Sequence, residues 1–157
     1  MENGILLEME VIKELASNDK GYRSLTRSWF KNSPLLEIIQ QAQQLGFKLI
    51  ITTDHGTINV KQPSKVIGDR NTSLNLRYKT GRSLTYEDKD VLAALDPETV
   101  GLPTINMSSS FIFAKGELFF AYPNNYNHYV SYYRNTYQHG GVSLEEVIIP
   151  FAVLNPR

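Results

Sequence analysis

The sequence predicts an α/β fold, in which helices flank a central sheet. Residues 34–45 have the apolar periodicity of an amphipathic helix, and the short β-branched segment 47–53 that follows is typical of a buried strand. A second apolar segment, 147–154, follows a short helix start and is also typical of a buried strand. Asp54-His55-Gly56 directly follows the first strand, at the carboxyl end where ligands gather in open α/β sheets.

The helix over residues 34–45 is marked at both ends. Ser33 suits the N-cap, Pro34 the first turn and Gly46 the stop. Residues 7–18 also place apolar side chains on one helical face. The apolar stripe that we expect to be buried in the better-marked helix consists of Leu35, Ile38, Ile39, Ala42 and Leu45.

The middle of the chain is predicted to alternate between loops and short elements. Residues 57–83 have little periodicity and are expected to form a long excursion with one short strand. Residues 91–103 are expected to form a short helix, and residues 110–122 a β-hairpin that turns at Lys115-Gly116. Beyond them we expect a tyrosine-rich helix within residues 124–137 and a capping box over residues 143–146.

Composition bounds the class of protein. The 157 residues suit one domain over residues 1–157, and the formal net charge of zero argues against general electrostatic affinity for nucleic acid or anionic membranes. The absence of cysteine excludes disulfides and thiolate metal ligands. The first residues lack the pattern of a secretory signal, and no apolar run approaches the ~20 residues of a membrane span. We therefore expect a cytoplasmic protein.

Charge is unevenly distributed along the chain. Residues 61–82 hold six basic residues and one acid, whereas residues 87–98 hold five acids and one lysine. One interpretation is a pair of solvated surfaces. The other is a basic rim that binds phosphate, for which the candidates are Arg70, Arg77 and Lys79.

Asp54 and His55 are candidate metal ligands. Adjacent side chains on a regular strand point to opposite faces, so the two can share an ion only if the pleat breaks, which Gly56 permits. Carboxylate oxygen and imidazole nitrogen suit zinc or manganese. The alternative is a turn at the strand end, in which Asp54 caps a backbone amide, and the motif alone leaves both interpretations open.

The other two histidines differ in context. His139 precedes two glycines and is either part of a turn or a ligand. Gly140 and Gly141 would let the backbone approach a ligand, and a helix capped by Ser143 would fix the loop. His128 lies in the tyrosine-rich segment and is interpreted as a packing or surface residue.

The segments "TTDHG" and "QHGGVSLEEVIIP", in this order, resemble the C-terminal half of the alkaline phosphatase superfamily. The longer segments "DHGTINVKQPSKVIGDRNTSLNLRYKTG" and "YPNNYNHYVSYYRNTYQHGGVSLEEVIIPF" resemble PglZ domains, and most closely the effector domain of PorX-type response regulators, which are linked to type IX secretion. The resemblance covers residues 8–154. It implies an incomplete alkaline phosphatase-like central sheet flanked by helices, with the β-hairpin as an excursion.

The same resemblance implies a two-metal phosphoric ester hydrolase, of phosphodiesterase or phosphatase type, that acts as the effector of a two-component response regulator. Asp54 and His55 match ligands of one ion and His139 a ligand of the other, with zinc as the metal and manganese as the alternative. Two such ions, roughly 4 Å apart, can clamp the attacking and leaving oxygens. A phosphate ester or nucleotide-like substrate and type IX secretion regulatory proteins are the implied partners.

Several residues of that superfamily are not recognisable in this sequence. They are the Ser or Thr nucleophile, an early Asp ligand and an Asp-x-x-x-His pair, whose place is taken by "ENGILLEMEV". We therefore expect the C-terminal portion of a PglZ domain, without a receiver domain, N-terminal half or catalytic nucleophile, and inactive alone. Its half-sheet would leave an unpaired edge and exposed apolar surface, which a homodimer would cover.

The alternative function is a non-catalytic signalling or interaction module. Such a module would keep the fold and bind protein partners through its tyrosine-rich and charged surfaces.

Overall fold

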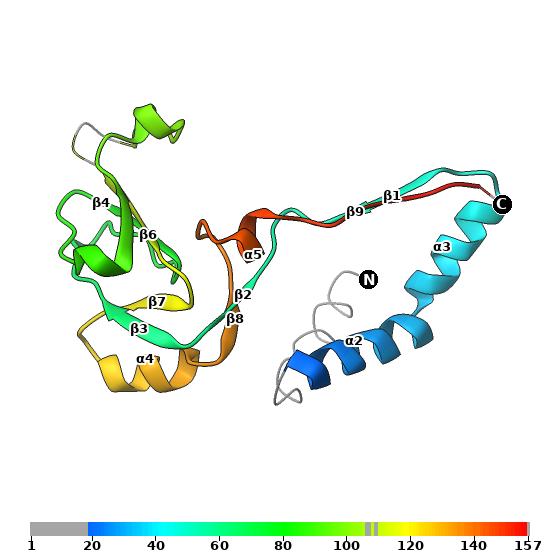
Figure 1. Cartoon of the computed structure of the whole chain (residues 1–157), viewed down its shortest axis with the longest axis horizontal. Helices are drawn as coiled ribbons and strands as arrows, with labels where there is room; N and C mark the ends of the chain where they lie inside the picture. Colours follow the sequence, from blue (N-terminus) through cyan, green and yellow to red (C-terminus); the bar gives the residue numbers. More distant parts are fainter. Residues whose placement is uncertain (1–18, 106–107, 109, 157) are drawn as a thin grey trace. The chain divides into compact units, whose positions relative to one another are not determined.

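The computed structural model describes residues 19–105, 108 and 110–156 (Figure 1). The chain divides into a terminal unit, formed by Met1–Ile51 with Phe151–Arg157, and a central unit, Thr52–Pro150. The prediction of one domain over residues 1–157 stays a prediction, and each unit is described separately below.

The described part of the terminal unit contains two helices and a two-stranded sheet. Helix α2 (Asp19–Asn32) was not expected, whereas α3 (Pro34–Gln44) begins after Ser33 and is followed by Gly46 at φ +84°, as predicted. The helix expected over residues 7–18 lies outside the described residues. Strands β1 (Leu49–Thr52) and β9 (Phe151–Leu154) pair with each other.

The apolar faces of these elements are exposed, contrary to the prediction of buried segments. No residue of α3 is buried, and Ile38, Ile50 and Phe151 expose 59%, 60% and 67% of their surface. Periodicity correctly indicated the elements, but burial also needs a facing layer, which periodicity does not report. Such exposed apolar surface is what an incomplete sheet leaves.

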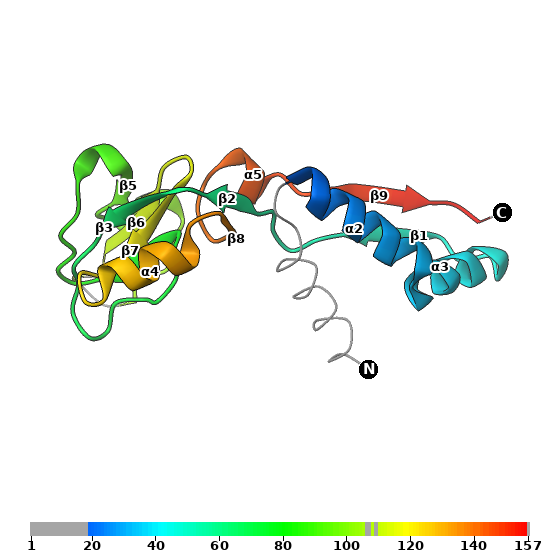
Figure 2. The ribbon, with the colours of Figure 1, turned by 90° about the horizontal axis from the view of Figure 1, so that it is seen from below.

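The central unit consists of short strands in three small sheets (Figure 2). Its strands are β2 (Ile58–Val60), β3 (Gln62–Lys65), β4 (Tyr78–Gly81), β5 (Val91–Ala94), β6 (Ser110–Ala114), β7 (Leu118–Ala121) and β8 (Thr136–Gln138). β2 pairs antiparallel with β8, β3 pairs parallel with β7, and β6 lies between β4 and β5 in an antiparallel sheet. Mixed helices and small sheets are consistent with an incomplete α/β fold.

The helices of the central unit are short. Two are 3₁₀ turns, η1 (Asp88–Asp90) and η2 (Pro97–Val100), and two are α-helices, α4 (Tyr126–Tyr133) and α5 (Leu144–Val147). The expected tyrosine-rich helix and capping box are thus confirmed as α4 and α5. In the part of the chain that the structure describes, no helix is long and apolar enough to cross a membrane.

Three predicted elements differ from the structure. Residues 57–83 contain β2, β3 and β4 instead of one strand, and residues 91–103 contain β5 and η2 instead of a short helix. The two strands of the expected hairpin exist as β6 and β7, but each belongs to a different sheet. Strand partners depend on contacts distant in sequence, which local turn signals do not report.

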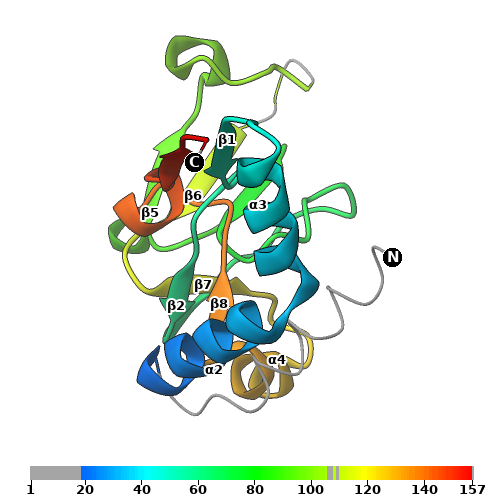
Figure 3. The same cartoon turned by 90° about the vertical axis from the view of Figure 1, so that its right-hand side faces the viewer.

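The core of the central unit has two parts. One contains Ile112 and Phe120, and the other contains Val60 and Phe119 with Tyr133 packed against it. Phe119 and Phe120 enter different parts because successive side chains of a strand point to opposite faces. The β2–β8 pair, which lies side by side in Figures 1 and 3, leads from this core to the histidine loops.

Candidate functional site

The pairing of β2 with β8 brings two distant histidines together. Ile58 is opposite Gln138 in this antiparallel pair. Residues that precede one strand therefore lie beside residues that follow its partner. His55 and His139 meet there, with ring centroids 3.8 Å apart and ring planes inclined by 12°.

The half-buried His55 ring has a defined orientation. Its Nδ1 lies 2.9 Å from the carbonyl oxygen of Gly56. Because a carbonyl only accepts hydrogen bonds, this contact favours the tautomer with the proton on Nδ1, which leaves the Nε2 lone pair to accept a proton or bind a metal. Donation from the second ring nitrogen to a backbone carbonyl is the usual arrangement of metal-binding histidines.

The carboxylate of Asp54 lies beside the same ring. Its Oδ1 is 3.7 Å from His55 Nε2 and accepts a hydrogen bond of 3.1 Å from the His55 backbone amide. Asp54 thus makes the amide contact of a turn while its exposed carboxylate stays near the imidazole. Both interpretations of the motif are compatible with these contacts.

The three candidate ligands form a partial donor set. Within the described residues, no group of three or more histidine, aspartate or glutamate side chains is arranged to hold an ion. The structure brings two imidazoles together and one carboxylate next to His55. Imidazole nitrogen and carboxylate oxygen are suitable zinc donors, so these residues fit part of a metal centre in their chemistry.

A buried ion pair, which we call the Arg77–Glu146 clamp, lies next to the loops that carry His55 and His139. Arg77 Nε donates to Glu146 Oε1 at 2.9 Å, and Nη2 donates to Oε2 at 2.8 Å. The two side chains are 0% and 1% exposed. Arg77 Nη1 also donates to the carbonyl of Leu118.

The clamp contacts the loop that carries His139. The Glu146 carboxylate accepts hydrogen bonds from the amide of Gly141 at 2.9 Å and from the amide and hydroxyl of Ser143 at 3.2 and 2.7 Å. Burial raises the pKa of Glu146, but the hydrogen bonds from Arg77, Ser143 and Gly141 together hold that pKa below its usual value. The carboxylate is therefore ionised at neutral pH.

Helix α5, which carries Glu146, also contacts the loop that carries His55. The amide of Gly56 donates to the carbonyl of Glu146 at 2.8 Å. A Cβ atom at Gly56 would lie 2.0 Å from the Glu145 carbonyl oxygen, so only glycine fits this close approach. The Arg77–Glu146 clamp therefore fixes α5 against both histidine loops.

The predicted phosphate-binding residues lie in different environments. The phosphate-binding prediction for Arg77 assumed a position on a basic loop, but the structure buries this residue in the clamp. Arg70 is exposed on the loop after β3 and remains a prediction. Lys79 is 1% exposed, and burial lowers its pKa to about 8. His128 is exposed on α4, in accord with its interpretation as a surface residue.

Sequence reasoning found the capping role of Glu146 but not its ion pair with Arg77. The two residues are distant in sequence, and no spacing rule links them. The sequence signal that could have indicated a buried ion pair was the position of Arg77 in a segment that also contributes strands to the core.

Comparison with protein families identifies a match over most of the chain. Residues 7–154 match the family described as the BREX system PglZ alkaline phosphatase-like domain. This range includes both histidine motifs. No curated protein matches the sequence significantly.

Proposed function

The chain belongs to the PglZ family of alkaline phosphatase-like domains, and on this premise we propose that His55 and His139 are part of the metal centre of a phosphoesterase. The observation that supports this proposal best is the 3.8 Å contact between two imidazoles from separate motifs. Two glycine-containing loops and a buried ion pair position the two imidazoles. A turn at the end of a strand would not require these contacts.

The residues have distinct proposed roles. His55, oriented by the Gly56 carbonyl, and Asp54 would bind one ion, and His139 would bind the other. Zinc, or manganese in its place, supplies Lewis-acid stabilisation of phosphoryl oxygens when it is bound. The Arg77–Glu146 clamp holds the loops that present these ligands, and Arg70, whose charge is exposed, would bind a phosphate ester or nucleotide-like substrate.

We further propose that this chain alone has little or no turnover. Only three matching ligands and no matching nucleophile are recognisable in it, whereas in-line displacement with two metals needs both ions held. The closer resemblance to PorX-type effectors supports a cytoplasmic role in a two-component response regulator linked to type IX secretion. Regulatory proteins of that system and a second copy of the chain are the proposed partners.

Zinc calorimetry on the metal-stripped chain tests the ligand assignment. We expect Asp54→Ala and His139→Ala each to weaken zinc binding by about tenfold or more, because each removes a donor, while His128→Ala leaves the affinity unchanged. Equal affinity in all four proteins would refute metal binding at these residues.

A matched assay with a chromogenic phosphodiester tests activity. We expect the rate with added zinc or manganese to stay at the rate with the metal alone. Turnover that needs the chain and disappears in His139→Ala would show that the missing parts are dispensable.

A non-catalytic interaction module is the second candidate. It is favoured by the absence of a three-ligand group within the described residues and by exposed aromatic side chains such as Tyr132 on α4. The zinc titration separates the two, because an interaction module has no need for affinity that depends on His139.

A further inference from the structure

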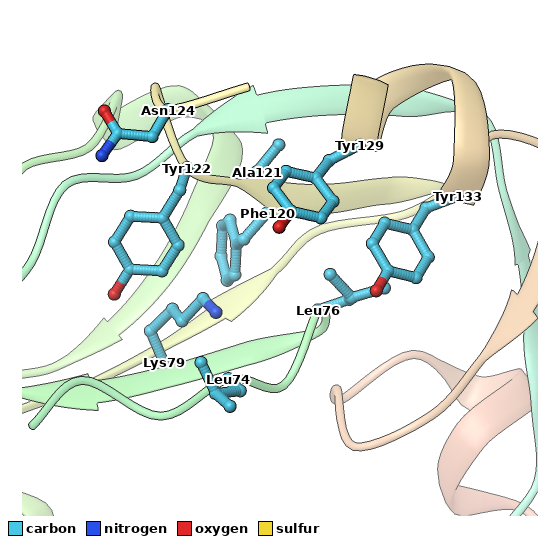
Figure 4. A pocket seen from close by; sticks show the side chains of 9 residues that line it. All are labelled: Leu74, Leu76, Lys79, Phe120, Ala121, Tyr122, Asn124, Tyr129 and Tyr133. Carbon is cyan, nitrogen blue, oxygen red and sulfur yellow. The ribbon is translucent and has the colours of Figure 1, made fainter. Parts of the chain in front are cut away.

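A pocket that neither histidine lines lies between β4, β7 and α4 (Figure 4). Its volume is about 390 Å³, within the ~300–1,000 Å³ typical of small-molecule sites. Neither His55 nor His139 lines it. Its walls are formed by Leu74, Leu76, Lys79, Phe120, Ala121, Tyr122, Asn124, Tyr129 and Tyr133.

Lys79 brings a buried positive charge to this pocket. Its side chain is 1% exposed, and its Nζ donates to the carbonyl of Ser73 at 2.8 Å and lies 5.1 Å from the centre of the Tyr122 ring. The ion pairs found among the described residues do not include Lys79. Burial of an ammonium group is costly, and a carbonyl and an aromatic face compensate its charge less well than an anion would. An anion in the pocket would therefore be stabilised by Lys79.

The remaining walls are mostly aromatic. Tyr129 and Tyr133 project from α4 with their ring planes inclined by 14° and their centroids 6.2 Å apart. Figure 4 shows these rings and that of Tyr122 around the same space as the Lys79 amine. Aromatic faces favour a flat ring over an aliphatic chain.

We propose that this pocket binds a small planar aromatic anion. The anionic group, a carboxylate or a phosphonate-like group, would bind Lys79 Nζ, and the ring would pack against Tyr122 and Tyr129. The pocket and the histidine pair share no lining residue, so we expect binding in the pocket not to require the metal centre.

Calorimetry with phenylphosphonate and with benzoate, in excess chelator, tests the proposal. We expect at least one of them to bind, and the one that binds identifies the preferred anionic group. Methylphosphonate or acetate, which keep the charge but lack the ring, should bind about tenfold more weakly or worse. Lys79→Met should weaken the aromatic anion by about tenfold or more, because a charge-assisted hydrogen bond is lost.

Two controls and one further test variant complete the design. Lys89→Met removes an exposed lysine, and His139→Ala alters the histidine pair, so both should retain full affinity. Tyr129→Leu changes a side chain that is 39% exposed in the free chain, so it should keep the fold and weaken the aromatic anion several-fold. If Lys79→Met does not fold, the Tyr129→Leu result decides. Absence of binding by both aromatic anions, or unchanged affinity in a folded Lys79→Met chain, would overturn the proposal.

Discussion

Replacement of Glu146 by glutamine is expected to lower the free energy of unfolding of the central unit by about 3 to 5 kcal/mol. The change leaves the Arg77 guanidinium buried without a negative partner, and it weakens the hydrogen bonds that the carboxylate accepts from Gly141 and Ser143. Chemical denaturation followed by circular dichroism measures the loss. Because the clamp holds both histidine loops, zinc affinity should fall as well.

Glu145→Gln is the matched control, since it makes the same chemical change at the exposed neighbouring position. We expect it to shift stability by less than about 0.5 kcal/mol. Equal effects of the two substitutions would contradict the clamp. An Arg77→Leu/Glu146→Leu double variant should lose less than the sum of the single changes, because neither charge is then left unpaired.

Acid should act on the same group. The pKa of folded Glu146 lies below its ordinary value of 4.5, so the stabilisation is fully present above that value and is lost as the pH falls through the folded pKa. The stability of Glu146→Gln should therefore depend less on pH in this acidic range than that of the unaltered chain.

Replacement of Gly56 by alanine should also destabilise the central unit, by a smaller amount. The new Cβ would lie 2.0 Å from the backbone oxygen of Glu145, and backbone cannot move aside as a flexible side chain does. We expect a loss of about 1 to 3 kcal/mol in the free energy of unfolding. Zinc affinity should decrease because His55 is displaced, and calorimetry on the folded variant measures this effect.

Gly101→Ala separates steric overlap from backbone strain. Gly101 has φ +72°, but an added Cβ would meet no atom within 4 Å. We expect this variant to lose about 1 kcal/mol and to bind zinc like the unaltered chain. If Gly101→Ala impairs zinc binding as much as Gly56→Ala does, the close approach to α5 is not what positions His55.

Local signals in the sequence were sufficient to predict the ends of the helices that have recognisable capping residues. Ser33 and Pro34 start α3 and Gly46 follows its end, and Ser143 and Glu146 form the capping box of α5, as predicted. In α5 the signal works through a local bond, because the Glu146 carboxylate accepts the Ser143 amide three residues earlier. Ser33 makes no capping side-chain bond, so the signal for α3 is the backbone preference of Pro34 and of Gly46. The placement of His55 beside His139 was inferred from the family resemblance, and the β2–β8 register supplies its structural cause.

Features set by distant contacts could not be read in the same way. Residues 91–94 form β5 by pairing antiparallel with β6, although a short helix was expected over residues 91–103. Arg77 lies in a basic segment and was predicted as a phosphate-binding candidate, but it is buried against Glu146, which lies on a helix distant in sequence. The stripe of α3 has the pattern of a buried face, yet burial depends on a neighbouring layer that the pattern does not report.

The most direct test of the proposed metal centre is a long-range ¹H–¹⁵N spectrum of the histidine rings during zinc titration. The chain has three histidines, so the exposed His128 serves as an internal control. We predict that the ring nitrogens of His55 and His139 shift together as zinc is added, while those of His128 remain unchanged. Movement of the His128 signals alone, or of none of the three, would contradict the assignment of His55 and His139 as metal ligands.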